Sequence, residues 1–264
     1  IFLVDKCNII LNNVKFFNCA NYKSSLITAE RDIELTVNNC NFMSNKIMNH
    51  FNLGYSKVTI KDSYFSGTDC IGSAVMLNRG QLIVENSIFE NFNAYHGSAI
   101  NYKGDYFSIR NSKFLNSRVN ATGGAMIIKF FALTDQPIPY YTSDSIIENC
   151  QFINLSSTSN GGAIHLDMDS GTQRVYPNLT VKDSNFTDCK SKFGGAISIL
   201  GGNVNIVKSN FTANTADFEG GALYTSWTRL NITNSTFTAN TGAKNAGALF
   251  FDKGKLIIKN SNFT

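Results

Sequence analysis

Apolar and polar positions alternate in short runs that return along the whole chain at intervals of about 25 residues. Each unit holds a triplet of small residues, two alternating runs, an Asn or Asp, a small residue and a Phe. The Phe positions form one register: Phe16, Phe42, Phe65, Phe89, Phe114, Phe152, Phe186, Phe211, Phe237 and Phe263. Repeats of about 20–50 residues are typical of solenoids, propellers and arrays. The pattern therefore predicts about ten turns of one structural unit.

The residue five places before each Phe is apolar and nearly always β-branched, which is typical of the core face of a strand. These residues are Leu11, Val37, Ile60, Val84, Ile109, Ile147, Val181, Ile206, Ile232 and Ile258. Small triplets such as Gly194-Gly195-Ala196 precede the other alternating run. They predict a sharp turn beneath a neighbouring coil, followed by a second strand with its own inward face.

Three places before the Phe, nine of the ten residues are Asn or Asp. The column consists of Asn13, Asn39, Asp62, Asn86, Asn111, Asn149, Asp183, Lys208, Asn234 and Asn260. Asn and Asp tolerate the left-handed backbone of a bend, and the alternation breaks at this point. We expect a buried corner in which the amides of successive coils hydrogen-bond to one another. Ordinary surface turn residues are the alternative.

Short strands that pair with the same strands of the next coil predict parallel sheets. The expected fold class is all-β, a right-handed parallel β-helix of about ten coils of about 25 residues, with its hand set by the crossover rule. A propeller competes, but its blades need about 40 residues. We expect residues 1–264 to form a single β-helix segment of a longer protein. Loop insertions are predicted near 130–143 and 167–177, where all three prolines lie.

Two short motifs resemble those of a known family. One is GGA plus an aliphatic residue, as in Gly194–Ile197, and the other is Phe-x-x-Asn, as in Phe211–Asn214. Their pairing resembles the repeats of the chlamydial polymorphic outer membrane proteins and of related large surface proteins of protists and algae. The resemblance covers nearly the whole chain, although the last residue of Phe-x-x-Asn is replaced at Cys19, Thr68, Ser117 and Cys189. It implies a β-helical cell-surface or secreted protein of adhesive or structural type, without catalysis.

The composition adds few functional constraints. Hydrophobic residues make up 43% of the chain and charged residues 16%, so a large core can form. The net charge of +4 comes from scattered Lys and Arg, which implies neither nucleic acid nor an acidic membrane surface as a partner. No apolar run is long enough to span a membrane.

Eight Asn-x-Ser/Thr sequons occur in the chain, and none precedes Asn120. We expect N-linked glycans, and no other cofactor, at Asn120, Asn154, Asn178, Asn185, Asn210, Asn231 and Asn262. Asn234 belongs to the Asn corner, so we expect it to be buried and bare. Chance sequons in a chain rich in Asn, Ser and Thr are the alternative.

Six cysteines form no CxxC motif and no Cys/His metal spacing, and no metal site is expected. Cys40 and Cys150 occupy the small inward position two places before the Phe, which predicts buried structural thiols. The even count is compatible with disulfides but assigns none, because no two cysteines share a column in adjacent coils.

His165 with Asp167, Asp169 and Asp183 is the one acid and histidine cluster that suggests chemistry. Parallel β-helices do host polysaccharide lyases and hydrolases, and hydrolysis needs two carboxylates about 5–9.5 Å apart. No neighbouring coil supplies further acids or an Arg here, so we expect no enzyme and no catalytic residue. A carbohydrate-binding or polysaccharide-degrading β-helix remains the alternative function.

An outward-facing column of the second strand is unusually apolar, and contiguous exposed apolar surface often marks an interface. Together with an aromatic insertion, it predicts an interface formed by Met76, Ile127, Phe130, Phe131, Tyr140, Tyr141, Tyr224 and Phe250. The alternative is that the insertion of the same chain covers this face.

We therefore expect a secreted or cell-surface structural or adhesive glycoprotein rod. It would assemble laterally or end to end with other chains or copies of itself, including as a filament, with carbohydrate as a further partner.

Overall fold

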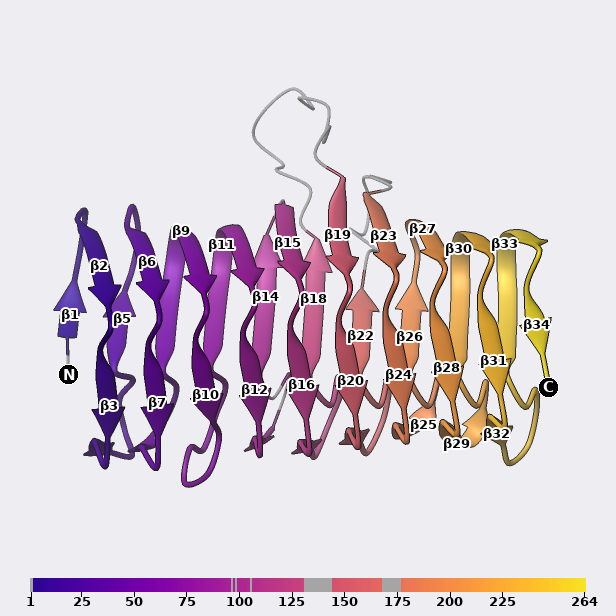
Figure 1. The fold of residues 1–264 in the computed structure, drawn as a ribbon, viewed down its shortest axis with the longest axis horizontal. Coiled ribbons are helices and arrows are strands. Elements are labelled where there is room, and N and C mark those ends of the chain that lie inside the picture. The colour runs from indigo at the N-terminus through magenta and orange to yellow at the C-terminus, as the bar shows by residue number, and fades with distance from the viewer. Residues whose placement is uncertain (1, 96, 98, 105, 131–143, 168–176) are drawn as a thin grey trace.

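The computed structural model is a parallel β-helix whose coils stack along one axis to form a rod (Figure 1). It describes residues 2–95, 97, 99–104, 106–130, 144–167 and 177–264. Within these ranges each strand pairs in parallel with the equivalent strand of the neighbouring coil. The expected fold class is confirmed. The described ranges contain no helix that is long and apolar enough to cross a membrane.

The largest sheet of the described residues has two arms that meet at a bent edge. The first arm follows the small triplet of each coil, and the second arm leads to the Asn corner. Long strands such as β9 and β30 run through both arms. Its sixteen strands are β1 (Phe2–Val4), β2 (Asn8–Asn12), β5 (Ile27–Ala29), β6 (Glu34–Asn38), β9 (Phe51–Lys61), β11 (Val75–Glu85), β14 (Ile100–Gly104), β15 (Tyr106–Arg110), β18 (Met126–Phe130), β19 (Ser145–Glu148), β22 (Ile164–Asp167), β23 (Asn178–Lys182), β26 (Ile197–Leu200), β27 (Asn203–Val207), β30 (Leu223–Thr233) and β33 (Leu249–Lys259). The insertions expected near 130–143 and 167–177 fall mainly on residues 131–143 and 168–176, which lie outside the described residues.

The Phe register forms a second sheet, and short strands that close most of the described coils form a two-stranded and a six-stranded sheet. The Phe sheet contains β3 (Lys15–Phe17), β7 (Asn41–Met43), β10 (Tyr64–Ser66), β12 (Ile88–Glu90), β16 (Lys113–Leu115), β20 (Gln151–Ile153), β24 (Asn185–Thr187), β28 (Asn210–Thr212), β31 (Thr236–Thr238) and β34 (Asn262–Phe263). The closing strands are β4 (Ala20–Asn21) and β8 (Lys46–Ile47), then β13 (Asn93–Ala94), β17 (Arg118–Val119), β21 (Ser156–Ser157), β25 (Lys190–Phe193), β29 (Thr215–Glu219) and β32 (Thr241–Gly242).

The Phe side chains stack in one continuous column through the core. Neighbouring ring centroids lie 4.4 to 5.1 Å apart, with interplanar angles of 7° or less. Isolated aromatic pairs prefer offset or edge-to-face contacts. The parallel stacking follows instead from the sheet, because one Phe per coil at the same position repeats at about the 4.8 Å strand spacing.

The Asn corner is confirmed as a left-handed bend but not as a buried one. All ten residues of the column have φ between 47° and 58°. Hydrogen bonds donated by side-chain amides join three pairs of neighbouring coils: Asn39 to Asn13 (2.6 Å), Asn86 to Asp62 (3.0 Å) and Asn149 to Asn111 (2.9 Å). The column is exposed except for the half-buried Asp183, because the bend turns its side chains outward. The expectation that Asn234 is buried was therefore wrong.

Two buried polar ladders support the bends from inside. Ser63 Oγ accepts a hydrogen bond from the Cys40 N–H (3.1 Å) and donates one to the Lys61 carbonyl (2.6 Å), and this pattern recurs at the same position of later coils. The Asn of Phe-x-x-Asn acts similarly: Asn214 Oδ1 accepts from the Cys189 N–H, and Nδ2 donates to the Phe186 carbonyl, both at 3.0 Å. These contacts satisfy backbone groups at buried turns.

The small triplets allow coils to touch through their backbones. A Cβ atom added to Gly195 would lie 2.0 Å from the Gly221 carbonyl oxygen of the next coil. The preceding Gly194 has a φ of 66°, so it also needs the left-handed freedom of glycine. The predicted sharp turn under a neighbouring coil is confirmed at this position.

Candidate functional site

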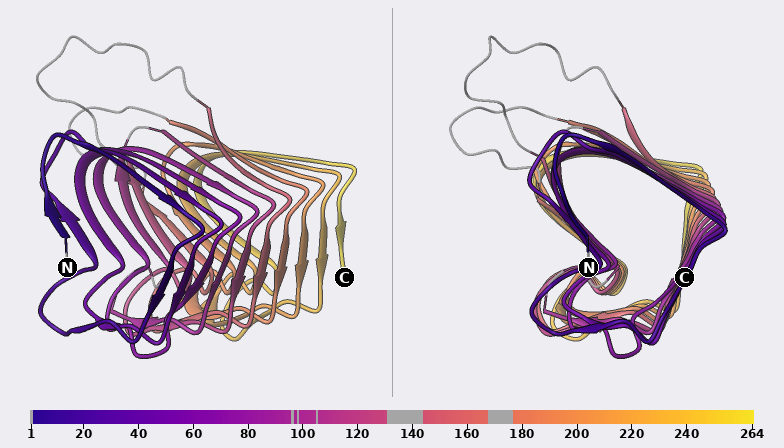
Figure 2. Two further views of the ribbon diagram at one scale, coloured as in Figure 1. Left: turned by 60° about the vertical axis from the view of Figure 1, so that its left-hand side comes forward. Right: turned by 90° about the vertical axis from the view of Figure 1, so that its left-hand side faces the viewer.

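The predicted apolar column is formed by the second residue of each strand that follows a small triplet, as in β18, β22, β26, β30 and β33. Viewed down the rod, the coils share a re-entrant corner, seen beside the N label in the right-hand view of Figure 2. Parallel pairing places Ile127, His165, Ser198, Tyr224 and Phe250 side by side on successive strands. The middle of the column is covered: Ile127 is 6% exposed, His165 5% and Ser198 0%. The prediction of a continuous exposed face was wrong, because the chain folds back against this column at the corner.

The other predicted interface residues divide into three groups. Met76, Tyr224 and Phe250 are half-buried, so part of each side chain reaches the surface. Phe130 faces inward and packs against Phe107, with ring centroids 6.0 Å apart, so its assignment to a surface was wrong. Phe131, Tyr140 and Tyr141 lie outside the described residues, so their assignment to the interface stays a prediction.

Four half-buried aromatic residues, Phe193, Phe218, Tyr224 and Phe250, form what we call the corner strip. Tyr224 and Phe250 stack with centroids 5.3 Å apart, and Phe193 contacts both Tyr224 (5.3 Å) and Phe218 (5.5 Å). Lys192 and Lys244 place their ammonium groups 4.6 and 3.8 Å from the Phe218 ring centroid. Burial raises the pKa of the Tyr224 hydroxyl, and the carboxylates of Glu219 and Asp252 add to this. The strip can offer an apolar surface with a cationic rim.

The cluster around His165 is not assembled as a reactive site by the described residues. Asp167 forms an ion pair with Lys129 (3.2 Å), and Asp183 lies at the Asn corner, where it pairs with Lys182 (3.4 Å). The position of Asp169 lies outside the described residues. Across the residues that the structure describes, no three His, Cys, Asp or Glu side chains gather where they could hold a metal ion.

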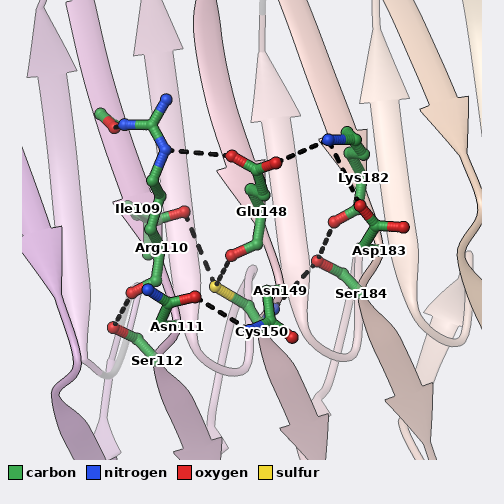
Figure 3. Close-up of polar contacts among 11 residues, drawn as sticks. Ile109, Arg110, Asn111, Ser112, Glu148, Asn149, Cys150, Lys182, Asp183 and Ser184 are labelled. Atoms are coloured by element: carbon green, nitrogen blue, oxygen red, sulfur yellow. Dashed lines mark hydrogen bonds and ion pairs between the residues drawn. The ribbon is translucent and has the colours of Figure 1, made fainter.

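The outer face of the second arm carries cross-strand ion pairs between coils. Glu148 on β19 accepts from Arg110 of β15 (3.1 Å) and from Lys182 of β23 (2.7 Å), as Figure 3 shows. Hydrogen bonds from Lys182 and then Arg110 lower the pKa of the Glu148 carboxyl. Opposite charges directly across a ladder stabilise a sheet, so these groups join coils rather than form a reaction centre.

The predicted glycosylation sites differ in exposure. Asn120, Asn154, Asn178, Asn210 and Asn262 are exposed, whereas Asn185 and Asn231 are half-buried. Several belong to surface amide ladders; for example, Asn210 Nδ2 donates to Asn185 Oδ1 (2.9 Å) and Asn231 Nδ2 to Asn205 Oδ1 (2.9 Å). Glycosylation at these sites stays a prediction, and Asn234, being exposed, loses the reason for which it was expected to be bare.

All six cysteines are free thiols. Cys40 and Cys150 are 3% and 1% exposed, which confirms the predicted buried positions. Burial raises the pKa of Cys70, Cys150 and Cys189 to about 12, so these thiols are protonated near neutral pH and are poor nucleophiles.

One surface feature escaped the sequence analysis: the bent edge between the two arms, which we call the ridge. Its residues lie ten places before the Phe register, and the described ones are Lys6, Asp32, Tyr55, Arg79, Gly104, Gly201, Trp227 and Lys253. Tyr55 and Trp227 are 52% and 61% exposed, and each carries a cation over its ring from the next coil. Both have a positive φ, which is rare for a bulky side chain. The available signal was an aromatic residue at a bend position that the other described coils give to Gly or a charged residue.

Comparison with known proteins agrees with this geometry. A family model described as the right-handed β-helix region matches residues 49–237, more than half of the chain. The chain therefore belongs to the right-handed β-helix family, and the predicted hand is confirmed. No curated protein and no solved structure matches the chain. The finer resemblance to the repeats of polymorphic outer membrane proteins stays a prediction.

Proposed function

We propose that this chain is a structural and adhesive rod of the cell surface or of a secreted layer, glycosylated and without catalytic activity. The observation that supports the proposal is the coil-to-coil continuity of the interior, where the Phe column and the Ser and Asn ladders tie each coil to the next. A rigid scaffold of this kind holds outward side chains at fixed spacing. That property suits a protein that spaces or joins others, through lateral or end-to-end contacts.

The corner strip is the lateral joint that we propose between copies of this chain. Its aromatic rings are half-buried within one chain, and a second copy would complete their burial, as aromatic residues do at interface centres. We expect the purified chain to form side-by-side dimers or larger arrays as its concentration rises. We expect Tyr224→Ser with Phe250→Ser to shift this equilibrium toward monomers by about tenfold or more in dissociation constant.

Sedimentation velocity over a range of concentrations measures this equilibrium, and electron microscopy of negatively stained particles shows how the rods align. The matched control is Tyr22→Ser, which also removes an exposed aromatic side chain, 54% exposed, but far from the strip. A chain that stays monomeric at every concentration, or an array that the double variant leaves intact, would contradict the lateral joint.

Glycan occupancy provides a test of the proposed secretory route. When the chain passes through a eukaryotic secretory pathway, we expect the exposed Asn120 to be modified most completely and the half-buried Asn185 least. Asn185 and Asn210 lie on neighbouring strands, so two glycans would crowd one another. A glycopeptide map by mass spectrometry gives the fraction modified at each sequon. Unmodified Asn120 in a fully secreted chain would count against glycosylation of this rod.

A further inference from the structure

A short apolar patch lies on the edge where the early coils close. Outside the first and last coils, the large apolar side chains that are exposed among the described residues are Met48, Tyr55, Ile71, Tyr95 and Trp227. Tyr55 and Trp227 stand on the ridge in coils that are far apart. The other three belong to successive coils, each six places after its Phe, and are 40%, 46% and 69% exposed. We call Met48, Ile71 and Tyr95 the edge patch.

Backbone and side-chain contacts bring the three residues to equivalent places in neighbouring coils. The Ile71 N–H donates to the carbonyl of the residue before Met48 (3.0 Å), which sets Ile71 beside Met48. Ser73 Oγ donates to the Gly97 carbonyl (2.8 Å), and these residues lie two places after Ile71 and Tyr95. The patch is therefore contiguous. Its three coils each have a neighbour on both sides, so the exposure does not come from an unpaired end.

The column changes from apolar to polar at Asn120, the first sequon of the chain. The Asn120 N–H donates to the Ala94 carbonyl (3.3 Å), and the strands before both residues pair in register, so Asn120 lies beside Tyr95. Asn120 is exposed. The later residues of this column are polar, charged or small: Thr158, Lys192, Asp217 and Ala243. The edge patch thus ends at the point from which a glycan would start.

We propose that the glycan carried by Asn120 folds back along the rod and packs on the edge patch. This inference rests on the proposed function, which makes the chain a glycoprotein. Coils repeat at about 4.8 Å, so Tyr95, Ile71 and Met48 lie about 5, 10 and 14 Å from Asn120 along the axis.

The chemistry of the first sugars suits this surface. One face of a sugar ring presents mainly C–H groups, which pack on aromatic and aliphatic side chains, while its hydroxyls stay in water. Tyr95 offers a ring directly beside the attachment point, and Ile71 and Met48 extend the apolar surface under the sugars that follow. Packing there removes from water an apolar surface that a soluble rod would otherwise expose.

The size of the patch favours an attached glycan over a partner protein. A stable protein interface takes about 20–30 residues a side, and the edge patch has three. Contacts between a sugar and a few apolar side chains are weak, but attachment at Asn120 makes them intramolecular, so a high effective concentration supports them. The edge patch shares no residue with the corner strip, so this inference and the proposed lateral joint can fail separately.

Endoglycosidase H tests whether the glycan is packed. The chain is secreted from eukaryotic cells that leave every N-linked glycan in its high-mannose form, which this enzyme cuts after the first sugar. We expect release from Asn120 of the folded chain to be at least about tenfold slower than from the exposed Asn262, because the packed sugars must first detach. After heat denaturation the two rates should become equal. Glycopeptide mass spectrometry over time gives both rates.

Two double variants show whether the edge patch causes the protection. Ile71→Ser with Tyr95→Ser, the patch variant, should speed release from Asn120 by about tenfold while the chain stays folded, because both side chains are exposed. Tyr55→Ser with Trp227→Ser is the matched control. It removes two exposed apolar side chains from the ridge, 52% and 61% exposed, and should leave the rate within about twofold.

Removing the glycan should uncover the edge patch. We expect Asn120→Gln to raise the fluorescence of the hydrophobic dye ANS by about twofold or more, because the dye reports exposed apolar surface. Asn262→Gln also removes one glycan but should leave the fluorescence unchanged. Adding the patch variant to Asn120→Gln should remove the gain.

The outcomes separate this proposal from the proposed function. A secreted chain that is unmodified at Asn120 would remove both the inference and glycosylation at this site. Release from Asn120 as fast as from Asn262 would show a glycan that projects into water, and glycosylation would stand while the inference fell. Slow release that persists in the patch variant would place the protection elsewhere. Self-association that the patch variant abolishes and Asn120→Gln leaves intact would make the edge patch a protein joint instead.

Discussion

Replacing Phe186 with Ala is expected to lower the free energy of unfolding by about 3–5 kcal/mol. The Phe186 side chain is 0% exposed, and its ring lies 4.6 Å from that of Phe152 and 4.8 Å from that of Phe211, centroid to centroid. Removing one ring from the middle of the column leaves a cavity that two flanking strands, fixed by their ladders, can close only in part.

Urea unfolding followed by circular dichroism at 25 °C measures this effect. Phe17→Ala is the matched control, because Phe17 lies on a strand of the same sheet but is 60% exposed, and we expect it to cost less than about 1 kcal/mol. If the Phe186→Ala and Phe17→Ala variants unfold with the same urea midpoint, the column is not close-packed. Loss of a single cooperative transition would show that the rod separates into two units at the cavity.

The periodic part of the fold could be predicted from the sequence because a solenoid repeats its chemistry. Each column is a list of residues that share one environment, so the Phe column and the left-handed Asn corner were recognisable without coordinates. The burial of His165 and Ser198 was not predictable in this way. It depends on how sharply the chain turns back at the re-entrant corner, and alternation along a strand carries no information about that angle.

The candidate sites show the same division. The half-buried Tyr224 and Phe250 were found because they break the polar character of an outward column. Phe130 was misplaced because it ends its strand, where one residue of register decides between core and surface. Trp227 was overlooked because a bend position is defined by its φ, which the sequence alone does not give.

Acidification from pH 7 to pH 5 is expected to cost the chain about 2 kcal/mol of stability through one residue, His50. His50 stands in the column that Leu26 and Ala74 occupy in the neighbouring coils, and it is 0% exposed. Phe42, Phe65 and Phe92 surround it, with ring centroids 5.5, 5.7 and 6.0 Å away. Among the residues that the structure describes, neither ring nitrogen of His50 has a hydrogen-bond partner.

The sign of the effect follows from the cause of the shift. Burial disfavours the imidazolium and lowers the pKa of His50 from 6.5 to about 3 in the folded chain. Below pH 6.5 the unfolded chain takes up a proton that the folded chain does not, so stability falls with each step toward pH 3. Glu148, whose folded pKa is lowered, contributes stability above its ordinary pKa of 4.5 and loses most of it only as the pH falls further. A variant at position 50 separates the contribution of His50 from those of His96 and His165.

His50→Leu provides the comparison, because Leu26 already fills the same position in the preceding coil. The variant should be at least as stable as the parent at pH 7, since it removes a buried polar group without partners. It should also keep that stability at pH 5, and urea midpoints at the two pH values give both numbers. If parent and variant lose the same stability on acidification, the titrating group lies elsewhere. If the parent loses none, His50 reaches water in the folded chain and the core around it opens more readily than its packing indicates.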